Sequence, residues 1–163
     1  MKLIRLAVIS LALLFIVASL IGALLPSTVL VSRAVNMNTT RDSVMPYIKD
    51  IRQWKVWIEG MQDSSVKIYS STNAHLGATI VNITQVSDST VISSWIARSG
   101  NFQISTLRLI GDSVQKVTVV QWQFEQKLKW YPWERLGSMM NDKILGTMME
   151  KNLNSLKLLV EKK

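Results

Sequence analysis

The residues with the chemistry for catalysis or metal binding are few in this chain. His75 is its only histidine and there is no cysteine, which excludes disulfide bonds, thiol nucleophiles and zinc sites that need cysteine. The segment TNAHLG around His75 is typical of a turn, and no motif pairs the imidazole with a serine or an aspartate. We therefore expect His75 to be a solvated loop residue.

The carboxylates also lack the spacing of a catalytic pair or a metal site. They are scattered over the chain and include Asp50, Glu59, Asp63, Asp88, Asp112, Glu125, Glu134, Asp142, Glu150 and Glu161. The sequence has no glycine-rich phosphate loop and no base-reading basic helix, and its net charge of +8 is not gathered in one run. We expect no metal, no cofactor and no nucleic-acid partner, and the sequence favours a non-enzymatic role.

Asn152 is the polar residue with the most informative position. At 100° per residue it falls between Met149 and Leu156 on an apolar helical stripe. A buried, unpaired polar group costs about 1–3 kcal/mol, so this amide must bind protein, water or a ligand. An internally satisfied asparagine and a ligand contact are both open interpretations.

The elements around these residues can be read from hydrophobic periodicity. Residues 28–38 predict a first strand, and residues 42–61 predict a helix whose capping side chains lie just before it. Residues 66–126 contain repeated short extended runs separated by turns, which predict an antiparallel meander. A broad apolar stripe over residues 136–161 predicts a long final helix lying across the sheet. This order indicates an α+β domain.

Particular segments carry a resemblance to a known superfamily. VSRAVNMNTTRDSVMPYIKDIRQWKVWIEG, with Asp50, Trp54 and Trp57, and KVTVVQWQF, followed by Pro132, Arg135 and MEKNLNSLKLLVEK, resemble the START-like, Bet v 1-type superfamily. Its bacterial members are often labelled polyketide cyclase or SRPBCC proteins. The resemblance covers residues 29–163 and implies a helix-grip fold, in which a curved antiparallel sheet wraps around the long C-terminal helix. The START-like domain would span residues 28–163.

The resemblance implies a cavity between the sheet and the final helix that binds an apolar or lipid-like small molecule. The candidate lining residues are Trp95, Phe102, Trp122, Phe124, Met148, Met149, Asn152 and Leu156. For the aromatic and methionine side chains, ordinary core packing is the alternative. An enzyme of the cyclase or hydratase kind and a protein-interaction module without a ligand are the alternative functions.

An aromatic cluster precedes the final helix. Trp130, Tyr131 and Trp133 stand among Lys127, Lys129 and Arg135, a composition suited to lipid headgroups. We expect these aromatic residues to contact a membrane or a partner, and packing against the end of the sheet is the alternative.

The N-terminal segment is apolar enough to cross a bilayer. Residues 6–25 carry no charge, and a helix of that length spans roughly 30 Å. We expect residues 1–27 to form an uncleaved transmembrane anchor, with a cleaved signal peptide as the alternative. Lys2 and Arg5 favour a cytoplasmic N-terminus and an exported domain. Because no flexible linker follows Pro26 and Ser27, the domain should lie on the membrane surface.

Overall fold

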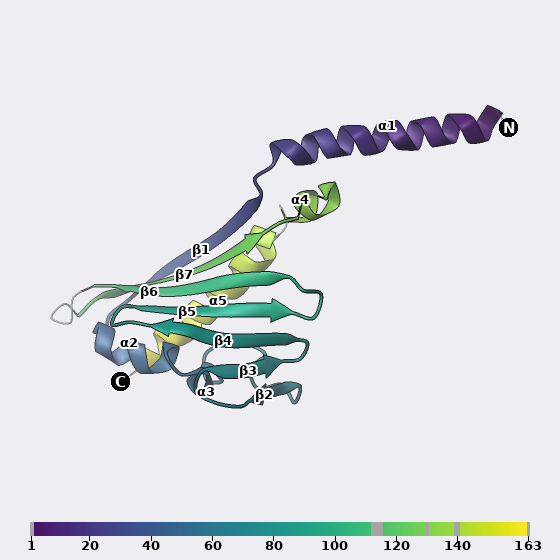
Figure 1. Cartoon of the computed structure of the whole chain (residues 1–163). Helices are drawn as coiled ribbons and strands as arrows, with labels where there is room; N and C mark the ends of the chain where they lie inside the picture. The colour runs from purple at the N-terminus through teal and green to yellow at the C-terminus, as the bar shows by residue number, and fades with distance from the viewer. Residues whose placement is uncertain (1, 112–115, 130, 139–140, 163) are drawn as a thin grey trace.

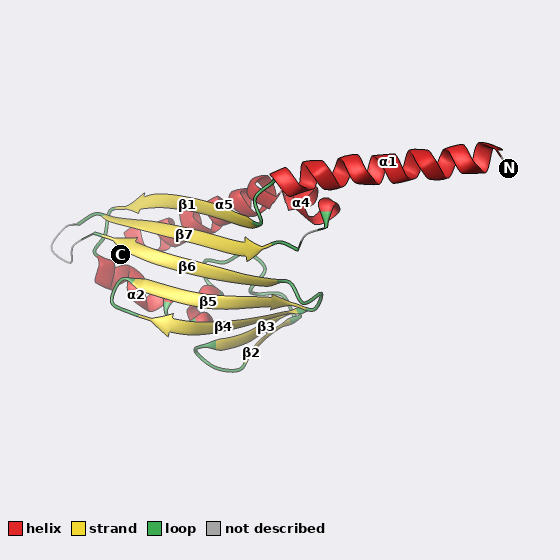
Figure 2. Cartoon of the chain, turned by 45° about the horizontal axis from the view of Figure 1, so that its top comes forward, coloured by secondary structure: helices red, strands yellow, loops and turns green. Residues whose placement is uncertain are grey.

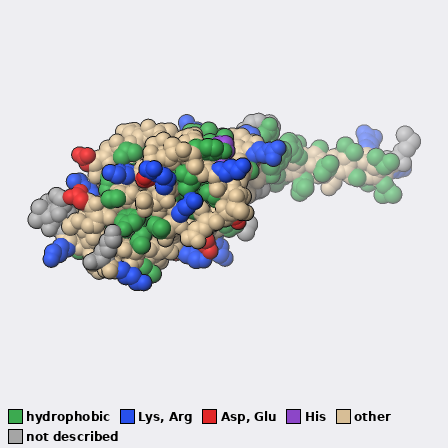
Figure 3. Space-filling model, turned by 90° about the horizontal axis from the view of Figure 1, so that it is seen from below, with side chains coloured by type: hydrophobic (Ala, Val, Ile, Leu, Met, Phe, Trp, Pro, Cys, Tyr) green, Lys and Arg blue, Asp and Glu red, His purple; other side chains and the backbone are tan. Residues whose placement is uncertain are grey.

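The N-terminal helix projects from the rest of the chain. A computed structural model describes residues 2–111, 116–129, 131–138 and 141–162. Helix α1 (Lys2–Leu24) extends away from the sheet, and its side chains are mostly exposed and apolar (Figures 1 and 3). By its length and its mean hydropathy of 2.7, α1 could cross a membrane. A signal sequence near the N-terminus meets the same criterion.

In the described residues, the sheet has seven antiparallel strands in the order β1-β7-β6-β5-β4-β3-β2. Strands β2 to β7 each pair with their neighbours in sequence, which is the predicted meander. Strand β1 pairs with β7, the last strand of the meander, from Thr28↔Lys127 to Met37↔Thr118. The strands are β1 (Thr28–Met37), β2 (Val66–Ile68), β3 (Asn73–Leu76), β4 (Thr79–Val86), β5 (Thr90–Ala97), β6 (Phe102–Ile110) and β7 (Thr118–Lys127).

Three helices cover one face of this sheet. Helices α2 (Arg41–Ile48), α3 (Ile51–Trp54) and α5 (Asn141–Glu161) all lie behind the strands, whereas α4 (Pro132–Ser138) lies beside the domain end of α1 (Figures 1 and 2). The predicted α+β class and the helix-grip arrangement are confirmed. Within the described residues, the other face of the sheet carries no helix.

Three local predictions from the sequence are corrected. The helix expected over residues 42–61 is two short helices, because Asp50 is extended and caps α3 by accepting a hydrogen bond from the Arg52 backbone N–H (2.9 Å). The final helix begins at Asn141, and α4 is a separate element. His75 lies in strand β3, half-buried with its ring against Tyr69 (4.8 Å between centroids), and is not a loop residue.

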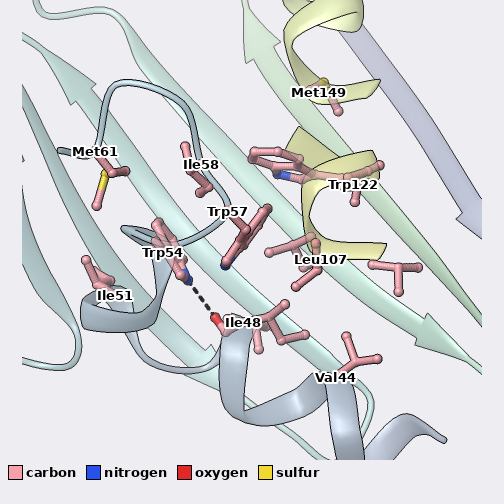
Figure 4. Packing of buried hydrophobic residues seen from close by; sticks show 14 of the residues in the cluster. Val44, Ile48, Ile51, Trp54, Trp57, Ile58, Met61, Leu107, Trp122 and Met149 are labelled. Atoms are coloured by element: carbon pink, nitrogen blue, oxygen red, sulfur yellow. Dashed lines mark hydrogen bonds between the residues drawn. The ribbon is translucent and has the colours of Figure 1, made fainter. Parts of the chain in front are cut away.

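Aromatic rings fill the space between the sheet and the helices (Figure 4). Trp54 stacks on Trp95 (6.1 Å), Trp57 meets Trp122 edge-on (5.6 Å), and Phe124 contacts both strand tryptophans (5.4 Å each). Each indole N–H has an acceptor: Ile48 O for Trp54, Tyr47 O for Trp57, Ser93 Oγ for Trp95 and Ser105 Oγ for Trp122. The rings therefore pack without leaving an indole donor unpaired, as burial requires.

An arginine ties the first strand to the final helix. Arg33 Nε donates to Glu150 Oε1 (2.7 Å), and Arg33 Nη1 donates to Asp142 Oδ1 (3.2 Å). Gly146 lies under the guanidinium, where a side chain would collide with it. The glycine thus lets the arginine cross the helix surface and reach both carboxylates.

Three backbone carbonyls at the end of α1 are bound by the domain. Arg135 Nη1 donates to Gly22 O (2.8 Å) and to Leu25 O (3.1 Å), and the Leu128 N–H donates to Ser27 O (2.8 Å). The last carbonyls of a helix have no hydrogen-bond partner within the helix. A cation at this end also interacts favourably with the negative end of the helix dipole. Arg135 therefore acts as a cap that joins α1 to α4.

We predict that Trp122→Phe lowers the stability of the domain by about 2 kcal/mol, because it leaves a small void and removes the donor bound to buried Ser105 (2.8 Å). Thermal unfolding of the full chain in detergent micelles, followed by circular dichroism, should show a midpoint about 5 °C lower. The matched control is Trp133→Phe, since that ring is 60% exposed. Equal shifts for the two variants would contradict the described packing.

We also predict an acid-dependent contribution from the cap of α3. Hydrogen bonds from the Arg52 side chain hold the pKa of Asp50 below its usual range. The ionised carboxylate is thus favoured in the folded state and stabilises it. This contribution to the free energy of unfolding is lost as the pH falls below about 4 and passes through the lowered pKa of the folded state. In thermal unfolding between pH 6 and about pH 3, Asp50→Asn should lose less stability than wild type.

The control for that measurement is Asp88→Asn, which alters an exposed carboxylate in the β4–β5 turn. Its acid dependence should follow that of wild type. Identical acid dependence in Asp50→Asn and wild type would contradict the assigned role of the Asp50–Arg52 pair.

Candidate ligand site between the sheet and the C-terminal helix

A polar pocket of about 230 Å³ opens where the segment after α3 crosses α5. Its walls come from residues 55–62 on one side and from α5 on the other, and it is lined by Lys55, Val56, Trp57, Ile58, Glu59, Gln62, Lys151, Asn152 and Ser155. The pocket thus combines apolar wall residues with polar groups from two elements.

Asn152 lines this pocket and carries an unused hydrogen-bond donor. The residue is fully buried, and its Oδ1 accepts a hydrogen bond from the Glu59 backbone N–H (2.9 Å). Its Nδ2 is also buried but has no hydrogen-bond partner in the described structure. The Oδ1 of Asn152 therefore fixes the loop to the helix. Its unpaired Nδ2 lowers the stability of the folded state, and a ligand that accepts a hydrogen bond from it would remove this penalty.

The other charged groups of the pocket are partly neutralised by one another. Lys151 Nζ and Glu59 Oε1 form an ion pair at 2.7 Å across the opening, and both side chains are more than half exposed. Gln62 Nε2 donates to Lys55 O (3.0 Å), which closes the loop on itself. Because Glu59 is paired, the free donor of Asn152 and the ammonium group of Lys55 favour a ligand that presents an oxygen acceptor.

Most of the predicted cavity residues form one packed core in this structure. Trp122, Phe124, Met149 and Leu156 are buried, and Trp95 is partly buried against them. Together with Trp54 and Trp57 they occupy the volume that the resemblance assigns to a cavity. Asn152 is the member of the predicted set that also lines the pocket described here.

Two of the predicted lining residues lie elsewhere, and for them the prediction is wrong. Phe102 is 50% exposed because it alternates with Gln103 and so faces away from the helices. Met148 is 38% exposed because it precedes buried Met149 and turns to the outer side of α5. The alternation of residues along β6 puts Phe102 on the opposite face from Ser105 and Leu107, and this pattern can be read from the sequence.

The sequence does not predict that residues 55–62 form one wall of the pocket. Residues 55–62 were expected to continue a helix, and only Trp57 and Ile58 of this stretch show the apolar spacing that attracts attention. The pairing of Glu59 with Lys151 joins residues separated by 92 positions, for which the single sequence gives no signal.

The described part of the predicted aromatic cluster lies beside helix α1. Tyr131 and Trp133 stack with 4.9 Å between ring centroids, whereas Trp130 lies outside the described residues. Trp133 also lines an apolar groove of about 580 Å³ whose other walls are Val8, Leu11, Ala12, Leu14, Phe15 and Ala18 of α1. Contact with a membrane or partner stays a prediction for these rings.

The described residues form no cluster suited to a metal ion. They contain no group of three or more histidine, aspartate or glutamate side chains placed to hold a metal ion. Several carboxylates instead have structural partners, as Asp50 has in Arg52 and Asp142 and Glu150 have in Arg33. The site therefore offers hydrogen bonding and apolar contact.

Comparison with known proteins adds the fold family. No family model matches the sequence, and no curated protein is significantly similar to it. Among solved structures, a START superfamily protein from Mycobacterium smegmatis has 13% identity and a TM-score of 0.62, covering 82% of this chain and 97% of the other.

Two further structures agree with that result. A Nitrosospira multiformis protein gives a TM-score of 0.62 at 12% identity, covering 80% of this chain and 94% of its own. A point mutant of norcoclaurine synthase from Thalictrum flavum gives 0.61 at 10% identity, covering 83% and 95%. At these identities the similarity concerns the fold alone: the residues that follow α1 have a helix-grip fold similar to that of these solved structures.

Proposed function

We propose that this chain is a membrane-anchored binding module for an amphipathic small molecule or lipid, whose oxygen-bearing end binds Asn152. The observation that carries the proposal is the buried Nδ2 of Asn152, which has no partner in the described structure and borders a pocket. An unsatisfied donor at such a position is costly unless a bound group accepts from it.

The similar structures support a binding role. One is a START superfamily protein, and the norcoclaurine synthase structure is a complex with a transition-state analogue, so a protein of similar fold binds a small molecule. An enzymatic role would need a free acid or base at the pocket. Glu59, the carboxylate among its lining residues, is already paired with Lys151, which leaves Lys55 without a neighbouring carboxylate partner in the described part of the chain and favours binding of a ligand oxygen over acid–base catalysis.

The apolar part of the ligand is accommodated by movement of residues 55–62. The pocket volume of about 230 Å³ suits a polar head with a few attached carbons, whereas the space behind it is filled by Trp57, Trp122 and Met149. The Glu59 N–H bond to Asn152 and the Glu59–Lys151 pair hold this segment on α5. Release of the segment exposes the aromatic interior to a hydrophobic chain, as a minor conformation that ligand binding stabilises.

The test is native mass spectrometry with organic extraction, applied to the full chain purified gently from its own membranes. The informative variant is Asn152→Asp, because the new carboxylate can still accept from the Glu59 N–H while the free donor is lost. We expect a bound mass in wild type and a loss of most of that mass in Asn152→Asp.

Ser155→Ala serves as the matched control on the same helix. Ser155 also lines the pocket, but its Oγ already donates to Lys151 O (3.1 Å), so its removal should leave occupancy unchanged. Circular dichroism must show that each variant remains folded. An empty wild-type protein, or equal occupancy in wild type and Asn152→Asp, would overturn the assigned site.

A further inference from the structure

An apolar row crosses the uncovered face of the sheet. Ile80, Ile96 and Phe102 lie directly opposite one another on β4, β5 and β6, and they are 38%, 38% and 50% exposed. We call these three residues the anchor-side row. Residues at these positions alternate with the buried residues that face the helices, so the row points away from the ligand pocket.

The strand register places this row beside the end of the anchor helix. Gln103 pairs with Gln126, and Lys127, the next residue of β7, pairs with Thr28 at the start of β1. Phe102 therefore lies level with Thr28, only four positions after the last residue of α1. Three extended residues between them reach at most about 10 Å along the strand direction.

The direction of α1 determines which side of the row faces the membrane. Figures 1 and 2 both show α1 running roughly along the strand direction, away from the sheet, with the β5–β6 connection and α4 on that same side. The three carbonyl contacts made by Arg135 and the Leu128 N–H fix the helix end to the domain. A bilayer crossed by α1 thus meets the end of the sheet that carries the row.

The charges at this end suit an anionic surface. Arg98, Lys127 and Lys129 are exposed here, and none of them has an ion pair within the described part of the chain. One exposed carboxylate, Glu125, lies opposite Ile104 on the same face, and Glu134 accepts a hydrogen bond from the Lys129 N–H. The unpaired charge is therefore predominantly positive, which anionic lipid headgroups attract.

We propose that the anchor-side row is a second membrane contact, which lies in the headgroup layer when α1 spans the bilayer. This inference rests on the anchor of the proposed function but does not depend on its ligand. Apolar side chains beside lysine and arginine are the composition expected of a surface that lies at the boundary between headgroups and acyl chains. The occupant of this surface is a lipid bilayer.

The chain is well suited to a direct test because it contains no cysteine. Single spin labels are placed by Phe102→Cys and by Ile110→Cys in the full chain, reconstituted in nanodiscs of zwitterionic and anionic lipid. Ile110 is the matched control, because it lies on the same strand and face at the opposite end and is 49% exposed. A third label at Leu14→Cys reports whether α1 is inserted.

Collisions with a water-soluble nickel complex and with oxygen measure the depth of each label. We expect the label at position 102 to lose collisions with nickel and to gain collisions with oxygen relative to position 110. Introducing Arg98→Glu in the Phe102→Cys chain should partly reverse this difference, since it replaces an attractive charge by a repulsive one.

The outcomes separate the two proposals. A label at position 14 that is shielded from nickel, together with equal nickel collisions at 102 and 110, overturns the second contact and leaves the anchor standing. A label at position 14 that is open to nickel overturns both the anchor and the contact. Ligand occupancy by mass spectrometry is measured separately, and its failure leaves the depth result unaffected.

Discussion

The pairing of β1 with β7 is the constraint on which the rest of the structure depends. It joins the beginning of the domain to the end of the meander, so the segments that precede β1 and follow β7 meet at one edge of the sheet. Helix α1 and helix α4 become neighbours for this reason, and Arg135 can reach the carbonyls at the end of α1. The same pairing sets Arg33 under α5, where two carboxylates hold the final helix across the sheet.

Much of the fold follows from periodicity, because strands and helices with one covered face repeat their apolar residues at fixed intervals. In strand β7, for example, Trp122 and Phe124 are buried while the residues between and beside them are more exposed. The break at Asp50 was harder to predict, because the apolar residues on either side keep helical spacing across it. Strand β3 was missed because its four residues are too short to show alternation, and sheet pairing alone defines them.

The candidate site could be predicted only in part, since it is formed by contacts between distant segments. Asn152 could be singled out from the sequence, because a polar residue in an apolar helical stripe is buried and needs a hydrogen-bond partner. Its neighbour Glu59 gives no such signal, because a charged residue on the exposed side of a predicted helix is ordinary. The filled aromatic interior was equally unpredictable, since the same tryptophans are compatible with lining a cavity and with closing it.

The cap on α1 also has a consequence for biosynthesis. Helix α1 leaves the ribosome before the rest of the domain does, and Arg135 is translated 113 residues after Gly22. Strand β1 sits at the edge of the sheet, where β7 is its one neighbour, and so it too must wait for residues 118–127. At ordinary rates of synthesis this delay lasts several seconds or more. Helix α1 and strand β1 are therefore synthesised before the segments that complete their contacts, and folding of the domain finishes only after both have left the ribosome.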